Sequence, residues 1–198
     1  MLPTHALVGL AIATPMLSLA PEHAIWALAG ALIGSILPDL DLYAGHRRSL
    51  HYPTGYAVGS IPVIVAAGFF LTPLLVGLTF ALVGAARHCR MDRYGGGLEL
   101  RPWEATSDRA MYDHVYDRWR RPKRWIRYDG APEDVLFAAL VGIPLVIVLE
   151  GPFQWLVIGS LLIGGTYGLL RRRLAALAPV VFGHAPEVVE THVPERYR

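Results

Sequence analysis

The fold of this chain can be approached through residues 49–86, SLHYPTGYAVGSIPVIVAAGFFLTPLLVGLTFALVGAA, a stretch without Asp, Glu, Lys or Arg. It is too long for one membrane-crossing helix, which needs about 20 residues. Leu71-Thr72-Pro73 offers a break in its middle, because proline removes an amide donor and clashes with the preceding helical turn. The stretch therefore predicts two apolar helices joined by a tight turn.

Four further stretches lack these charged residues: 1–21, 23–38, 135–149 and 151–170. Only 17% of the chain is charged, against about 25% in soluble domains, so it lacks the polar surface that a soluble protein needs. We predict an all-α polytopic membrane bundle of about six helical segments arranged as three hairpins, near residues 4–19, 24–37, 56–71, 73–88, 135–149 and 153–170. A cleaved signal peptide is the weaker interpretation of the first segment, because no Lys or Arg precedes it.

The 18 Lys and Arg residues gather in four places: residues 47–48, 87–127, 171–173 and 196–198. The short turns inside the three hairpins carry only Glu22, His23 and Glu150. By the positive-inside rule the basic side is cytoplasmic, which predicts a multi-pass protein of the inner (cytoplasmic) membrane with both termini inside. The membrane domain is expected to cover residues 1–173, including a cytoplasmic loop at 87–134, and residues 174–198 would form a cytoplasmic tail.

The second half of this loop, MYDHVYDRWRRPKRWIRY at residues 111–128, mixes aromatic and basic residues. One interpretation is an interfacial segment held by anionic headgroups, which makes membrane lipids its partners. The other is a solvated loop that follows the positive-inside rule. Neither needs a nucleic-acid partner, and none is expected. The sequence gives no signal for an oligomeric state.

Side chains that can bind metal converge on the predicted cytoplasmic face through topology alone. One opens the first segment, two close the second, two lie in the loop that follows, and two lie one turn apart near the end of the fourth. In chain order they are His5, Asp39, Asp41, His46, His51, His88 and Asp92. Imidazole and carboxylate together suit Zn²⁺, Mn²⁺ or Fe²⁺. The set therefore predicts one or two divalent ions, with Zn²⁺ as the first choice.

Each of these residues also has a simpler interpretation. A single histidine such as His5 is often a packed residue, and Asp39 and Asp41 could cap helices or pair with Arg47 and Arg48. Ionisable residues at membrane ends are costly unless they are used or paired, which favours a metal site for the set as a whole. The alternative is a non-enzymatic membrane scaffold or regulator with a structural ion or an ion-pair cluster.

The order of the motifs resembles the YdjM-like family of membrane-bound, metal-dependent hydrolases. The resemblance rests on Thr4-His5, Pro38-Asp39-Leu40-Asp41, His46-Arg47-x-x-x-His51 and His88-x-x-x-Asp92, and extends to Gly95-Gly96-Gly97-Leu98 and Pro102-Trp103. It implies a hydrolase fold embedded in the inner membrane with a His/Asp metal centre. Tyr52 departs from the pattern, since the family commonly has a small hydroxyl residue there, and no role of that hydroxyl carries over.

The expected chemistry is metal-assisted hydrolysis, in which a bound ion supplies hydroxide near neutral pH. Asp39 or Asp41, whichever is not a ligand, would act as general base, and Arg47 would hold a phosphate or an oxyanion. We expect an ester or phosphoester substrate at the cytoplasmic membrane surface, with a lipid or lipid-linked molecule as the first candidate. A histidine phosphatase of the lipid-phosphate type fits less well, because position 82 holds leucine where such enzymes have arginine.

Overall fold

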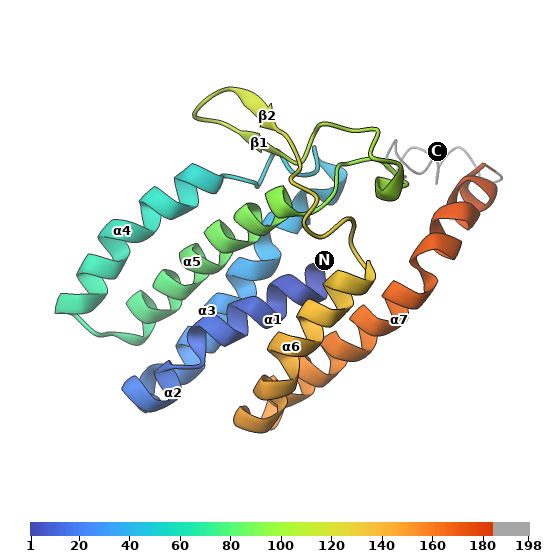
Figure 1. The fold of residues 1–198 in the computed structure, drawn as a ribbon. Coiled ribbons are helices and arrows are strands. Elements are labelled where there is room, and N and C mark those ends of the chain that lie inside the picture. Colours follow the sequence, from blue (N-terminus) through green and yellow to red (C-terminus); the bar gives the residue numbers. More distant parts are fainter. Residues whose placement is uncertain (184–198) are drawn as a thin grey trace.

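The computed structural model describes residues 1–183, and these are largely helical (Figure 1). The α-helices are α1 (Leu2–Ala13), α2 (Met16–Leu19), α3 (Ala24–Ile36), α4 (Pro53–Phe69), α5 (Pro73–Tyr94), α6 (Pro132–Val148) and α7 (Gly151–Phe182). Three short 3₁₀ helices are η1 (Pro21–His23), η2 (Leu37–Tyr43) and η3 (Pro102–Glu104), and the strands are β1 (Met111–Asp113) and β2 (Arg118–Arg120). The last part of the predicted tail, residues 184–198, lies outside the described residues.

The long helices form the predicted all-α bundle of hairpins, in which α1 packs on α3, α4 on α5, and α6 on α7. Four segments are long and apolar enough to cross a membrane: Leu2–Leu19, Pro21–Leu42, Pro73–Tyr94 and Gly151–Phe182. Helix α4 is apolar but shorter. The three hairpin turns lie at one end of the bundle, and the long connection from α5 to α6 lies at the other end (Figure 1).

The exterior of the bundle is apolar, as contact with lipid requires. Exposed side chains along its helices include Val58, Ile61, Ile147, Leu162 and Leu169. The interior between α1, α3, α6 and α7 is filled by buried Leu7, Leu10, Ala27, Leu145 and Val157, among others. Such a surface would be an aggregation hazard in water but is the favourable one in a bilayer.

Helices α3 and α5 approach each other through small residues. Gly30 and Gly34 on α3 face Gly77 and Ala81 on α5, and a Cβ atom at either α3 glycine would overlap a backbone carbonyl oxygen of the facing helix. This small-xxx-small spacing lets helix backbones approach closely in lipid. The contact brings the last turns of α5 against the end of α3, where the metal-capable residues were expected.

Two helices run further than the sequence indicated. Helix α5 continues past residue 88 to Tyr94, because no proline or glycine interrupts it before Gly95. Helix α7 continues to Phe182, so residue 174, where the tail was expected to begin, lies inside a helix. The extension of α5 matters for the site, because it keeps His88 and Asp92 on one helical face.

The connection from α5 to α6 carries a small β-hairpin that the sequence did not reveal. Strands β1 and β2 pair antiparallel, with Met111 opposite Arg120 and Asp113 opposite Arg118. Strands of three residues are too short to show the alternation by which strands are recognised. The amide of Tyr112 donates to the carbonyl oxygen of Arg47 at 2.9 Å, so the hairpin is attached to the loop between α3 and α4.

Candidate metal centre

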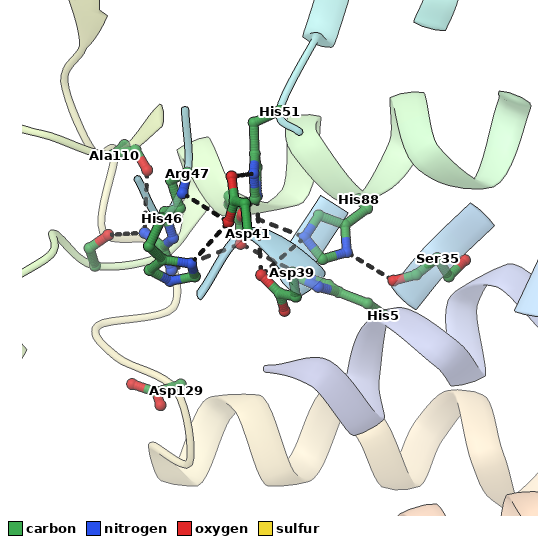
Figure 2. Close-up of polar contacts among 12 residues, drawn as sticks. His5, Ser35, Asp39, Asp41, His46, Arg47, His51, His88, Ala110 and Asp129 are labelled. Carbon is green, nitrogen blue, oxygen red and sulfur yellow. Dashed lines mark hydrogen bonds and ion pairs between the residues drawn. The ribbon is translucent and has the colours of Figure 1, made fainter. Parts of the chain in front are cut away.

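Four side chains from separate parts of the chain meet at the end of the bundle that holds the long connection (Figure 2). Asp39 lies on η2, His51 lies just before α4, and His88 and Asp92 lie one turn apart on α5. Their ligand atoms are all within 4.8 Å of one another. Nε2 of His51 is 3.0 Å from Oδ2 of Asp92 and 3.8 Å from Oδ1 of Asp39. Nε2 of His88 is 3.4 Å from each of these two oxygens.

These separations suit the ligand shell of a transition metal ion. Ligand atoms at about 2.0–2.1 Å from Zn²⁺ lie about 3.3 Å apart at the corners of a tetrahedron. The observed distances of 3.0–3.8 Å lie on both sides of that value. Two imidazole nitrogens and two carboxylate oxygens are also a donor set that divalent transition ions accept. The group of Asp39, His51, His88 and Asp92, called the His/Asp group below, could therefore hold a metal ion.

Both histidines of the His/Asp group are oriented through their other ring nitrogen. Nδ1 of His88 donates to the carbonyl oxygen of Ser35 at 2.7 Å, and Nδ1 of His51 lies 2.9 Å from Oδ2 of Asp41. Outer contacts of this kind fix the tautomer and the ring orientation of metal-binding histidines. Nε2 of His88 is buried and has no hydrogen-bond partner, as expected of a nitrogen that a metal ion would satisfy.

Asp41 lies beside the His/Asp group and organises the loop between η2 and α4. Its buried carboxylate accepts hydrogen bonds of 3.1–3.2 Å from the backbone amides of Arg47, Arg48 and Leu50. Nδ1 of His46 lies 3.2 Å from Oδ1 of the same carboxylate. Arg47, whose contact to Asp41 is drawn in Figure 2, has a left-handed backbone (φ +60°) within this loop. Both oxygens of this predicted ligand or base are thus engaged by the loop.

His5 reaches the His/Asp group from α1. Its ring packs edge-on against that of His88 with centroids 4.0 Å apart, and its Nε2 lies 3.6 Å from Oδ1 of Asp92. Both ring nitrogens of His5 are buried without a hydrogen-bond partner. Thr4 fixes the start of α1 by donating to Oδ1 of Asp134, at the start of α6, at 2.7 Å. His5 is therefore placed to add a further nitrogen ligand.

Arg47 and His46 lie on the side of the His/Asp group that faces a cavity. Nη1 of Arg47 donates to the carbonyl oxygens of Gly96 and Ala110 at 3.0 and 3.2 Å, and its Nη2 lies 3.6 Å from Oδ1 of Asp92. The guanidinium therefore balances one carboxylate of the group and ties the long connection to it.

The charges around His51 favour its protonated form in the metal-free site. Burial would lower the pKa of this imidazole, but hydrogen bonds to the Asp41 and Asp92 carboxylates outweigh burial and raise the pKa above its ordinary value of 6.5. The proton partly offsets the negative charge of the surrounding aspartates. A divalent cation would offset the same charge in its place.

A cavity of about 550 Å³ adjoins the His/Asp group, between α1, the end of α3, and α7. Five of the predicted site residues line this cavity: His5, Asp39, His46, Arg47 and Asp92. Its apolar lining includes Leu32, Ile36, Leu42, Leu156 and Ile163. A second polar set consists of Glu99, Asp129, Tyr167 and Arg171. Figure 2 shows that Asp129 stands apart from the His/Asp group.

The structure brings all the predicted site residues to one place but separates them by role. Four of the predicted ligands form the His/Asp group, whereas His5, Asp41 and His46 lie directly beside it. Metal binding by any particular one of them stays a prediction. The sequence analysis missed Ser35, whose contribution is a backbone carbonyl and leaves no signal in the sequence. It also missed the second polar set, which comes from segments that only the fold brings near the cavity.

Comparisons with family models, curated proteins and solved structures gave no match for this chain. The function is therefore argued from the site itself.

Proposed function

We propose that the chain is a membrane-embedded, metal-dependent hydrolase that acts on an ester or phosphoester at the membrane surface. The observation that carries the proposal is the buried Nε2 of His88, which makes no hydrogen bond and lies 3.4 Å from oxygens of both Asp39 and Asp92, next to a cavity large enough for a substrate. A site that served only to hold helices together would not need a cavity beside it.

A bound divalent ion would lower the pKa of its water from 15.7 to about 7 and so supply hydroxide near neutral pH. Asp39 is the member of the His/Asp group best placed to exchange protons with water, since its side chain is 23% exposed while those of His51 and His88 are fully buried. Asp41 acts as a positioning residue, because its oxygens hold the loop and the His51 ring. Under this proposal Asp39 is the general base, and His51, His88 and Asp92 would hold the ion with its fourth position left for water.

Arg47 is the residue proposed to hold the anionic part of the substrate. It lines the cavity, and its guanidinium lies against Asp92, so an oxyanion or phosphate near the metal ion would lie within reach. Planar guanidinium groups bind such anions through paired, charge-assisted hydrogen bonds. The apolar part of the wall, formed by Leu32, Ile36, Leu156 and Ile163, suits the hydrocarbon part of a lipid or lipid-linked substrate, because these side chains satisfy no polar group.

We also propose that the chain is related to the YdjM-like family, and that it lies in the inner (cytoplasmic) membrane with both termini inside. The resemblance is supported by the four ordered motifs, and the orientation by the absence of Lys and Arg from the three hairpin turns. Zn²⁺ is the first choice of metal because a set of His and Asp ligands at near-tetrahedral spacing suits it, with Mn²⁺ and Fe²⁺ as alternatives.

A structural ion site in a non-enzymatic scaffold is the second candidate. Its supporting observation is the burial of His51, His88 and Asp92, since structural metal sites are usually closed to solvent. The two proposals differ in one measurable respect. For a scaffold, metal removal would lower the stability of the protein and there would be no turnover to lose, whereas for a hydrolase it would also abolish turnover.

The deciding experiment compares the wild-type protein with a double variant that carries both His51→Ala and His88→Ala. The control variant is His23→Ala, which removes a histidine at the opposite end of the bundle. Metal content is measured after detergent purification without chelator. Hydrolysis of phosphomonoesters, phosphodiesters and carboxyl esters is then screened in mixed micelles with Zn²⁺, Mn²⁺ and Fe²⁺ in turn. We expect stoichiometric metal and turnover in wild type and the control, and neither in the double variant. Metal without turnover on any substrate class would favour the scaffold.

A further inference from the structure

A second cavity of about 470 Å³ lies on the opposite side of α5 and shares no lining residue with the first. Its walls are the start of α4, the last turns of α5 and the β-hairpin, which lies above these helix ends in Figure 1. Five cations line it: Arg87, Arg90, Arg93, Arg120 and Lys123. We call this feature the basic pocket.

The basic pocket has more positive charge than its own residues neutralise. Asp113 is its one carboxylate, and it is already paired with Arg120 at 2.8 Å. Among residues 1–183, no Asp or Glu lies within ion-pair distance of Arg87, Arg90, Arg93 or Lys123. Like charges held this close repel, so an external anion would be drawn to the pocket.

The placement of the arginines suits one anion held by several donors. Arg87, Arg90 and Arg93 follow at intervals of three residues, which places them on one side of α5, away from His88 and Asp92. All three arginines line the pocket, so a phosphate held there could accept charge-assisted hydrogen bonds from more than one guanidinium group.

The surroundings of the basic pocket indicate that the anion belongs to a membrane lipid. The outer face of α4 directly after the pocket is apolar and exposed, through Val58 and Ile61 among others. Tyr94 packs edge-on against Trp125, a residue that is 73% exposed, and Lys123 lies over the Tyr94 ring at 4.5 Å. Aromatic and basic side chains of this kind occupy headgroup depth in membranes.

We propose that the basic pocket binds the phosphate headgroup of an anionic phospholipid, with the acyl chains lying along α4. The proposal does not depend on hydrolysis at the metal centre, because the two cavities lie on different sides of α5. The bound lipid would fasten the β-hairpin to the membrane surface, and the same hairpin contacts Arg47 of the metal site through the Tyr112 amide.

The test measures binding of dioleoyl phosphatidylglycerol to the full-length protein in zwitterionic detergent by native mass spectrometry. The pocket variant is Arg87→Gln, Arg90→Gln, Arg93→Gln. The control variant is Arg101→Gln, Arg118→Gln, Arg173→Gln, which removes the same charge at exposed sites outside the pocket. We expect a saturable site that weakens tenfold or more in the pocket variant and less than twofold in the control. Phosphatidylcholine should not fill it.

Equal weakening in both variants would show general surface attraction and overturn the proposal. Displacement of the lipid by inorganic phosphate, at a concentration similar to that of phosphatidylglycerol, would identify a soluble-anion site instead. Displacement by a single-stranded oligonucleotide would identify a nucleic-acid surface. A circular dichroism spectrum and a thermal unfolding midpoint like those of the wild type show that the fold of the pocket variant is intact. If that variant does not fold, the single substitution Lys123→Gln is measured in its place, with a smaller loss of phosphatidylglycerol affinity expected and no loss refuting the site.

Discussion

The substitution Asp41→Asn tests whether this carboxylate organises the loop or binds the metal ion. Oδ1 of Asp41 faces the Arg47 amide and the His46 ring, and Oδ2 faces the amides of Arg48 and Leu50 and the His51 ring. In asparagine one of these two atoms becomes an NH₂ group, which cannot accept. At least one backbone hydrogen bond is therefore lost, whichever way the amide is turned, and the remaining bonds go to a neutral acceptor.

The size of the effect follows from the burial of Asp41. A hydrogen bond to a charged acceptor contributes about 1.5–3 kcal/mol and one to a neutral acceptor about 1 kcal/mol, so the loss of at least one bond and the weakening of the others amount to about 3 kcal/mol or more of local stability. Hydrogen exchange of the metal-free protein reports this directly, because exchange of these amides requires the loop to open. Since 1.4 kcal/mol corresponds to a factor of ten, peptides covering residues 45–51 should exchange about 100-fold faster.

Asp39→Asn is the matched control, because no backbone amide of the described loop bonds to Asp39. It should leave exchange at residues 45–51 unchanged and the metal bound, while turnover falls about 10²–10⁴-fold, as expected for the loss of a general base. The reasoning is refuted if Asp41→Asn removes the metal but leaves exchange of the metal-free loop at the wild-type rate. In that case Asp41 would be a ligand, and the loop would be held by other contacts.

Three further predictions follow from the fold and the charges. Reporter fusions at Glu22 and Ala105 should read outside and inside, and an outside signal at Ala105 would contradict the orientation. Gly34→Val should weaken metal binding tenfold or more by pushing α3 away from α5, whereas Gly165→Val, with open space around it, should not. Metal affinity should fall as pH drops through the raised pKa of His51, because the proton competes with the ion. The stability of the metal-free protein should instead be higher at low pH. Protonated His51 contributes its full stabilisation below pH 6.5, and this contribution is lost as pH rises through the folded-state pKa.

The helical hairpins and the place of the site could be predicted because both follow from apolar length and from topology. Once Leu71-Thr72-Pro73 divides the longest apolar stretch, the helix ends that carry Asp39 and His88 must lie at the same end of the bundle. This holds whatever the details of packing. The extension of α5 beyond residue 88 was harder to predict, because charged residues after an apolar run do not distinguish a continuing helix from a loop.

The roles of individual aspartates could not be read from the sequence. Pro38-Asp39-Leu40-Asp41 offers two carboxylates two residues apart, and only the tight turn of η2 sends Asp39 to His88 and Asp41 into the loop. The β-hairpin and the apolar cavity wall could not be predicted from the sequence either. The hairpin depends on contacts such as Tyr112 to Arg47, and the wall depends on α7 packing beside α1, both over long sequence separations.

The hairpin of α6 and α7 adds no side chain to the His/Asp group, yet the cavity depends on it. Asp134 on α6 accepts a hydrogen bond from Thr4 and so sets the position of α1 next to His5. Helix α7 supplies Leu156 and Ile163 to the cavity wall, and Arg171 reaches the carbonyl of Leu100 in the long connection at 3.0 Å. The contact between α3 and α5 thus assembles the candidate ligand atoms, while α6 and α7 shape the space beside them. A chain that needed only a structural ion would have little use for the second arrangement, and this is why we propose hydrolysis before a structural role.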